Sequence, residues 1–328
     1  MELVLNTFGT CLNRDTAGFV ITNQEGRQRI PAKDIKSIQI GRGAQITSDA
    51  VMLAIDNEID IIFTDQSGHP KGRIWSPQYG SISTIRKGQL AFTYSSDALV
   101  WIKGILLQKM ANQQALLLML PESKDERLGV MQQRAIDKIE EFRVKLREIE
   151  DTKLVSDVAV ELRGFEGMAS KYYFEVIAQY LPEEYRFGSR TQHPARDPFN
   201  AFLNYGYGVL YGKIEGELIR AGIDPYIGVL HRDDYNRPVL VYDVIEIYRI
   251  WVDYVVCNLV CQRVITDEYY SIRSDDSCWL ETLGRRVLIQ SLNDYLEEQT
   301  QTATQMQTRN TQLQLYAQNL AQQFKQYL

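Results

Sequence analysis

The sequence has few of the residues on which zinc sites and disulfide scaffolds depend. Its 328 residues include only four cysteines and three histidines, and no two cysteines form a Cys-x-x-Cys pair. This argues against a thiolate metal site and against a disulfide framework. Cys257 and Cys261 lie one helical turn apart in an apolar run, so we expect both to be small buried side chains.

Long apolar runs are also missing. Residues 115–120 form a short apolar stretch, and Asp253 interrupts the run that follows residue 239. Both runs fall short of the roughly 20 apolar residues that a helix needs to cross a bilayer. The first six residues turn polar at once, which is not typical of a secretory leader. We therefore expect a soluble, cytoplasmic protein with no membrane partner.

The chain also lacks an excess of positive charge. The chain has 36 Lys and Arg against 42 Asp and Glu, a formal net charge of -6. This balance argues against a general nucleic-acid binder. It does not exclude a specific one, because affinity for phosphates depends on where the basic residues cluster.

The pattern of apolar residues divides the chain into two parts. Short apolar or alternating runs separated by turn residues predict a β-rich domain over 1–85, with strands at 2–8, 18–22, 35–40, 59–64 and 71–75 and one helix at 47–57. Longer helical patterns predict a domain over 86–328, with helices near 87–119, 124–149, 153–180, 198–221, 239–265, 276–297 and 304–327. In the last of these, Leu313, Ala317, Leu320 and Phe324 form an apolar stripe that should pack on a neighbour. The fold class is α+β.

A few charged residues interrupt the apolar helical part. Asp243 and Glu246 are three residues apart and share one helix face, and the apolar residues around them predict that this face is buried. Buried carboxylates need a compensating cation, and a divalent metal is one candidate. Glu166 between two glycines and His231 in a loop would complete a set of imidazole and oxygen ligands, which suits Mn²⁺ or Mg²⁺. A salt bridge from Arg237 or Arg249 to the acidic pair would explain it equally well.

Two further groups have more than one interpretation. Arg186, Arg190 and Arg196 lie in one loop and could hold phosphates, or the loop could be a solvated one docked by Asp197. Asn200, Asn204 and Tyr207 follow on one side of a helix. They could support a metal centre from its second shell, or they could form a satisfied buried network.

Taken in order, these segments resemble the CRISPR-associated integrase family that acquires new spacers. The likeness covers nearly the whole chain, and one of the motifs that carry it is Gly164-Phe165-Glu166-Gly167. It runs through residues 68–70, 72–73, 164–169, 193–201, 205–207, 222–231, 237–238 and 242–249. The series of motifs is specific, although no single motif would suffice.

The resemblance implies a small N-terminal β-sandwich followed by a larger all-helical catalytic domain. It assigns the metal ligands to Glu166, His231 and Glu246, with Asp243 assisting in catalysis, and Mn²⁺ or Mg²⁺ as the cofactor. It also implies attack by a 3′-hydroxyl of a short duplex on a phosphodiester of the CRISPR array, with nuclease activity at the same site. The implied partners are a second copy of the chain, the small second numbered Cas protein, and double-stranded DNA. Backbone contacts to this DNA are then expected from Arg186, Arg190, Arg196 and Arg249.

Two other functions remain open from the sequence. One is a non-catalytic scaffold that binds nucleic acid and whose carboxylates are structural. The other is a metal-dependent hydrolase of small phosphate esters, which the extended position of the arginine loop makes less attractive. Binding and turnover with and without a chelator separate these functions.

Overall fold

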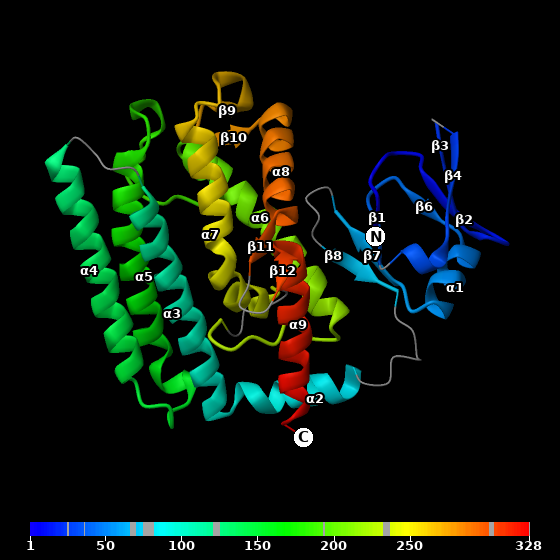
Figure 1. The fold of residues 1–328 in the computed structure, drawn as a ribbon, viewed down its shortest axis with the longest axis horizontal. Helices are drawn as coiled ribbons and strands as arrows, with labels where there is room; N and C mark the ends of the chain where they lie inside the picture. The colour runs from blue at the N-terminus through cyan, green and yellow to red at the C-terminus, as the bar shows by residue number, and fades with distance from the viewer. Residues whose placement is uncertain are drawn as a thin grey trace.

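The fold was taken from a computed structural model that describes residues 1–24, 26–35, 37–65, 70–74, 82–120, 125–192, 194–231, 237–301 and 305–327. The predicted turn at 68–70 falls mostly outside these ranges, as do His193 and residues 232–236. The described part is mixed α and β, with strands gathered at the N-terminus and helices in the rest, as the sequence predicts (Figure 1).

The N-terminal lobe contains two four-stranded sheets that share one hydrophobic core. The strands of the first sheet are, in spatial order, β1 (Glu2–Leu5), β5 (Ser37–Ile40), β7 (Asp60–Thr64) and β8 (Pro70–Arg73). Those of the second are β4 (Gly26–Ile30), β3 (Gly18–Asn23), β2 (Cys11–Asp15) and β6 (Gln45–Ile46), with helix α1 (Ser48–Asp56) after them. Residues of both sheets, including Leu5, Leu12, Phe19 and Ile38, meet in the core.

Three of these strands were missing from the sequence prediction. One of them, β6, has only two residues, and the other two are β2 and β4. In β4 only Ile30 is buried, and in β2 only Leu12 is buried. Both strands pair with β3, so their position is set by backbone hydrogen bonds to that strand. Strands with so few apolar residues carry almost no alternating pattern, and for this reason they could not be recognised.

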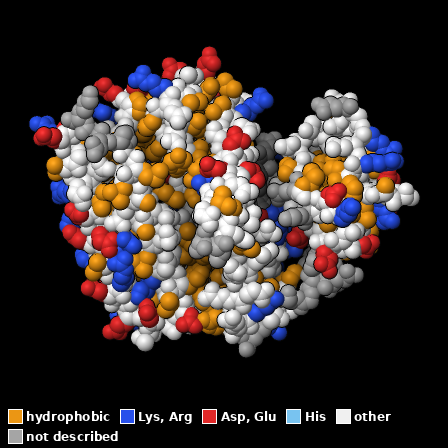
Figure 2. Space-filling model, viewed as in Figure 1, with side chains coloured by type: hydrophobic (Ala, Val, Ile, Leu, Met, Phe, Trp, Pro, Cys, Tyr) orange, Lys and Arg blue, Asp and Glu red, His pale blue; other side chains and the backbone are white. Residues whose placement is uncertain are grey.

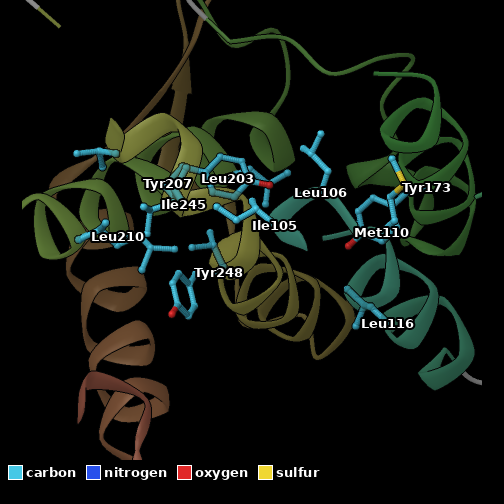
Figure 3. Close-up of a cluster of buried hydrophobic side chains, with 14 of the residues drawn as sticks. Ile105, Leu106, Met110, Leu116, Tyr173, Leu203, Tyr207, Leu210, Ile245 and Tyr248 are labelled. Carbon is cyan, nitrogen blue, oxygen red and sulfur yellow. The ribbon is translucent and has the colours of Figure 1, made fainter. Parts of the chain in front are cut away.

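The rest of the chain is built on long helices. Their bounds are α2 (Ile82–Thr93), α3 (Ser96–Met119), α4 (Glu126–Glu148), α5 (Val155–Tyr180), α6 (Pro198–Arg220), α7 (Val239–Cys261), α8 (Thr282–Glu297) and α9 (Arg309–Lys325). Helix α3 packs on α4, α5 and α7, while α6 packs on the other side of α7 (Figure 1). Figure 3 shows part of the core between these helices, with Met110 beside Tyr173 on one side, Leu203 and Ile245 on the other, and Ile105 between the two groups. The site described below is therefore carried by helices that a common core holds in place.

The helical part also contains strands that the sequence analysis did not predict. The hairpin β9 (Tyr270–Ile272) and β10 (Cys278–Leu280) precedes α8, and β11 (Gln299–Gln301) and β12 (Met306–Thr308) precede α9. As a result α8 and α9 begin five or six residues later than predicted. A three-residue strand is too short to show a periodic pattern.

One predicted helix is two helices in the structure. The sequence predicts a single helix over 87–119, but the chain bends by 85° between α2 and α3. The hydroxyl groups of Thr93 and Ser95 donate to the carbonyls of Leu90 and Phe92, which competes with continuation of the helix. The bend lets α2 pack across α9, where the ring of Phe92 lies 5.2 Å from that of Phe324.

Other local predictions had mixed outcomes. The stripe of four apolar residues on α9 is buried, as predicted. Cys257 is buried as well, whereas the prediction was wrong for Cys261, which is exposed near the end of α7. Within the described ranges, no single helix has the length and hydropathy to cross a membrane, although α2 and α3 pass that test when taken together as a bent pair.

The two lobes meet at α6. Arg73 of β8 donates to the carbonyl of Ile219 and pairs with Asp60 at 2.5 Å. Beside this contact, a cavity of about 420 Å³ opens between the first sheet and helices α6 and α9, and the space-filling view shows the lobes standing apart on one face (Figure 2). Glu215 of α6 is only 5% exposed near Lys71 and Asp65. Burial raises the pKa of Glu215 to about 7.

Candidate metal centre

The three predicted metal ligands face one cavity. Glu166 of α5, His231 from the loop before α7, and Glu246 of α7 all line a cavity of about 550 Å³. These residues are up to 80 positions apart in the sequence, and helix α3 brings them together by packing on both α5 and α7. The structure thus places the three side chains as a common site requires, while their role as ligands stays a prediction.

The burial predicted for the acidic pair on α7 is confirmed. Asp243 is fully buried and Glu246 is 7% exposed. The two carboxylates nevertheless have different surroundings. Asp243 faces the loop that ends at His231, and Glu246 faces α3 and α5.

Asp243 holds the His231 loop in place. Its Oδ2 accepts hydrogen bonds from the backbone N–H groups of Val229 (2.7 Å) and Leu230 (3.2 Å). Its Oδ1 accepts from the backbone N–H of His231 (3.1 Å) and lies 2.8 Å from His231 Nδ1. Both carboxylate oxygens are therefore occupied by protein donors. Asp243 therefore positions His231, and both of its oxygens are already used by protein donors where a metal ion would need them.

This arrangement also sets the state of the imidazole. With Nδ1 bonded to Asp243, the other ring nitrogen, Nε2, is the one left for a ligand, and the His231 side chain is 39% exposed toward the cavity. Burial alone would lower the pKa of His231, but the hydrogen bond and the charge of Asp243 outweigh it and raise that pKa. Gly228 is needed in this loop because an added Cβ would clash with the carbonyl oxygen of His231.

Lys109 of α3 is part of the centre, and the sequence analysis missed it. Its ammonium group forms ion pairs with Oε1 of Glu166 and with Oε2 of Glu246, the second at 2.5 Å. Burial alone would lower the pKa of Lys109, but the charges of Glu246 and Glu166 outweigh it and raise that pKa. A signal for Lys109 exists in the sequence, since it follows Ile102 and Leu106 at helical spacing and so lies on the buried stripe of α3.

Arg249 neutralises the same carboxylate from the other side. Its Nε donates to Oε1 of Glu246 at 2.9 Å, and its guanidinium lies 4.7 Å from the centre of the Tyr207 ring. Burial alone would raise the pKa of Glu246, but Arg249 and Lys109 outweigh it and lower that pKa to about 2. The salt bridge that the sequence analysis considered for Arg249 is present, so this arginine is largely committed within the site.

The arginines of the loop between α5 and α6 do not form one uniform group. Arg186 and Arg196 are exposed, and each donates to a backbone carbonyl, that of Leu181 and of Asp275 respectively. Arg190 is partly buried and donates to the side chains of Asn200 and Asn204. Its guanidinium also lies 5.3 Å from the ring of Phe174. Arg190 therefore fixes the loop, while Arg186 and Arg196 present charge to the outside.

The predicted supporting residues form a buried network. Asn200 is fully buried and donates to the carbonyl of Ser189, and Asn204 donates to the carbonyls of Thr191 and Gln192. Tyr207 donates to the buried carboxylate of Asp253. Of the two interpretations left open, the structure favours the satisfied network. Its effect on the centre is indirect, through the positions of Arg190 and the Tyr207 ring.

The donor set fits a hard divalent cation, with one condition. In the described ranges, no three His, Cys, Asp or Glu side chains are close enough, as they stand, to hold an ion. The cause is visible at the centre, where Lys109 lies between the two carboxylates. Oε2 of Glu246 is buried, and its direct partner is the Lys109 ammonium group, while Arg249 pairs with Oε1 of the same carboxylate. Two carboxylates and an imidazole are suitable ligands for Mg²⁺ or Mn²⁺ once the ammonium group moves aside.

Known proteins resemble this chain in sequence and in fold. The family model for "CRISPR associated protein Cas1" matches residues 3–294. The CRISPR-associated endonuclease Cas1 1 of Archaeoglobus fulgidus is 33% identical over 312 residues, which cover 92% of this chain and 90% of that protein. Among solved structures, a casposase bound to integration product has a TM-score of 0.72 at 22% identity, covering 99% of this chain and 95% of that one. A partial Cas6-RT-Cas1–Cas2 complex contains a chain with a TM-score of 0.74 at 21% identity, with coverage of 99% and 95%. The last two likenesses show a shared fold.

Proposed function

The chain belongs to the CRISPR-associated Cas1 family, and from this premise we propose that it is a metal-dependent DNA endonuclease and integrase. It inserts short duplex DNA into a CRISPR array by attack of a 3′-hydroxyl on a phosphodiester. The observation that carries the proposal is the position of Glu166, His231 and Glu246 on one cavity. The name of the Archaeoglobus relative, an endonuclease, supports the reaction class.

In the proposed mechanism, Glu166, His231 and Glu246 hold one Mn²⁺ or Mg²⁺ ion. When bound, such an ion polarises a phosphoryl oxygen and stabilises the charge that develops on the attacking or leaving oxygen. Asp243 keeps the proton of His231 on Nδ1, so that Nε2 is free to bind. Arg249 holds the carboxylate of Glu246 in position through Oε1 and leaves Oε2 facing the centre.

The DNA path in this proposal follows the exposed arginines beside the cavity. Arg186 and Arg196 contact phosphates directly, because their guanidinium groups are exposed. Arg190 and Arg249 line the cavity itself but are bound to side chains there, so they add to the positive potential more than they form new contacts. This division explains how a chain of net charge -6 binds DNA through a local surface.

The proposed assembly has two kinds of protein contact. A second copy of the chain pairs through the β-rich lobe, residues 1–85, and the helical part, residues 86–328, carries the catalytic site. The small second numbered Cas protein then bridges two such dimers. The solved Cas6-RT-Cas1–Cas2 complex supports this partner, because a chain of that complex shares the fold of this one.

The test is a strand-transfer assay on a labelled duplex, with Mn²⁺ or Mg²⁺ and with EDTA. Glu166→Ala and His231→Ala should each abolish the metal-dependent product, because each removes one proposed ligand. Glu161→Ala is the matched control, since Glu161 is exposed on the same helix five residues before Glu166. Integration at the parental rate by either ligand variant would show that the assigned roles are wrong.

A non-catalytic scaffold is the second candidate function. The observation that favours it is the ion pairing of Lys109, which gives Glu166 and Glu246 a structural partner without any metal. A scaffold would bind DNA equally well in EDTA and give no product under any condition. The same assay, read for both binding and product, decides between the two functions.

A further inference from the structure

Lys109 is a charged side chain buried at the candidate centre. It is 7% exposed, and its ammonium group bridges the carboxylates of Glu166 and Glu246. Enclosing an ammonium group is unfavourable unless its charge is compensated, and here the compensation comes from two of the three proposed ligands. The position between these two oxygens thus suits a cation, and the Lys109 ammonium group fills it.

A divalent ion and this ammonium group cannot share that position. Two positive charges a few ångströms apart repel strongly in a partly buried site, where solvent screens them poorly. The carboxylates themselves have other anchors. Ser170 Oγ donates to Oε1 of Glu166 at 3.0 Å, and Arg249 donates to Oε1 of Glu246. Both carboxylates can therefore stay in place when Lys109 leaves.

The cavity gives the lysine somewhere to go. Lys109 lies on the wall of the 550 Å³ cavity, together with Ser189 and Gln192. A lysine has a flexible four-carbon side chain with a strongly hydrated charge, so rotation into an open cavity that has polar lining residues needs no movement of the backbone. In that position the ammonium group adds to the positive charge of Arg190 on the same wall.

We propose that Lys109 is the internal counter-ion of Glu166 and Glu246 and that a divalent metal binds by displacing its ammonium group into the cavity. This inference rests on the metal-dependent function proposed above. In the absence of metal, Lys109 compensates Glu166 and Glu246 and keeps the helices α3, α5 and α7 together. In its presence, the same lysine faces the DNA path.

The first experiment compares Lys109→Met with Lys103→Met in a titration with MnCl₂. Lys103 is the matched control, because it is also buried on α3 (6% exposed) but pairs with Asp151 and the carbonyl of Ile149, away from the centre. Lys109→Met should bind Mn²⁺ about tenfold more tightly or better, because the buried Glu246 and the partly buried Glu166 have lost a shared counter-ion. Lys103→Met should bind Mn²⁺ as the parent does. Equal or weaker binding by Lys109→Met would overturn the inference.

A second measurement uses the parental protein, in case Lys109→Met does not fold. Reductive methylation followed by mass spectrometry reports how accessible each lysine is, with and without saturating MnCl₂. Methylation of Lys109 should rise several-fold with Mn²⁺, while that of Lys103 stays low in both conditions. If Mn²⁺ binds but Lys109 stays protected, the displacement is wrong and the metal-dependent function survives. If Mn²⁺ does not bind at all, both proposals fail.

Discussion

Replacement of Asp243 by asparagine tests whether this buried carboxylate holds the His231 loop and the His231 ring in position. Asp243 accepts four hydrogen bonds, two at each oxygen, from the backbone of residues 229–231 and from the His231 ring. Asparagine has almost the same shape, but one of its two polar atoms is a donor. Whichever way the amide group turns, two of the four donors then face an NH₂ group.

The size of the effect follows from the burial of these groups. Each buried N–H that loses its acceptor costs about 1–3 kcal/mol, so two of them lower the free energy of unfolding by roughly 2–6 kcal/mol. The carboxylate charge that strengthens all four bonds is also lost. If the amide group turns its NH₂ toward Nδ1, His231 must accept there and carry its proton on Nε2, the nitrogen proposed to bind metal. Loss of such a supporting bond typically weakens metal binding about 10–100-fold.

The assays are thermal unfolding in EDTA and Mn²⁺ binding on the same preparations. Asp253→Asn is the matched control on α7. Asp253 is also buried, but its described hydrogen-bond donors are the hydroxyl groups of Tyr173 and Tyr207, which can rotate to suit an amide. Asp253→Asn should therefore keep the parental Mn²⁺ affinity. If Asp243→Asn keeps both parental stability and parental Mn²⁺ affinity, the positioning role given to Asp243 is wrong.

Substitutions of the two loop arginines Arg190 and Arg196 give contrasting expectations, and Glu215 gives a prediction about pH. Arg190→Ala should lower the free energy of unfolding by about 2–3 kcal/mol, since it leaves Oδ1 of Asn204 without its donor and leaves Oδ1 of the buried Asn200 with the 3.3 Å bond from the backbone N–H of Thr191. Arg196→Ala should spare stability and reduce the slope of log DNA affinity against log salt by about 1. Denaturant unfolding and DNA binding over a KCl series check this pair, and the opposite pattern would contradict the division of the loop arginines. Burial raises the pKa of Glu215 to about 7, so the native state binds more protons than the unfolded state between about pH 4.5 and pH 7, and stability is lost as the pH rises through this window. Glu215→Gln should remove this loss, on the order of 2 kcal/mol between pH 5 and pH 8, and an unchanged pH profile in denaturant unfolding would show that Glu215 does not titrate there.

The long helices, and the burial of the acidic pair Asp243 and Glu246 among apolar residues, could be predicted from the sequence. Helices α4, α5 and α7 keep an amphipathic pattern over more than 20 residues each, which makes their existence clear even where an end is displaced. The bend between α2 and α3 could not be predicted, because it depends on packing against α9 from the far end of the chain. The two late hairpins were missed for a similar reason, since pairing with another strand fixes them and their own pattern does not.

Lys109 shows a different limit. A lysine at helical spacing among apolar residues is usually explained by a long side chain that reaches solvent along the surface, and α3 alone does not distinguish that case from a buried charge. The distinction needs Glu166 and Glu246, which are 57 and 137 positions further along the chain. Lys103, on the same stripe, is buried against an unrelated partner, Asp151. The pattern of α3 therefore does not say which of its lysines belongs to the centre.

The acidic pair on α7 shows why a correct expectation about burial does not settle chemical roles. Asp243 and Glu246 differ little in the sequence, since both are carboxylates on one apolar helix face. Because Asp243 and Glu246 are three residues apart, their side chains differ by roughly 60° in direction around the helix axis. This difference decides which neighbours each side chain contacts. Asp243 meets backbone N–H groups, which satisfy a carboxylate completely and leave no oxygen for an ion. Glu246 meets two side-chain cations, and one of these, Lys109, can move away. Only a carboxylate whose partner can leave is available to a metal, and for this reason the proposed ligand on α7 is Glu246.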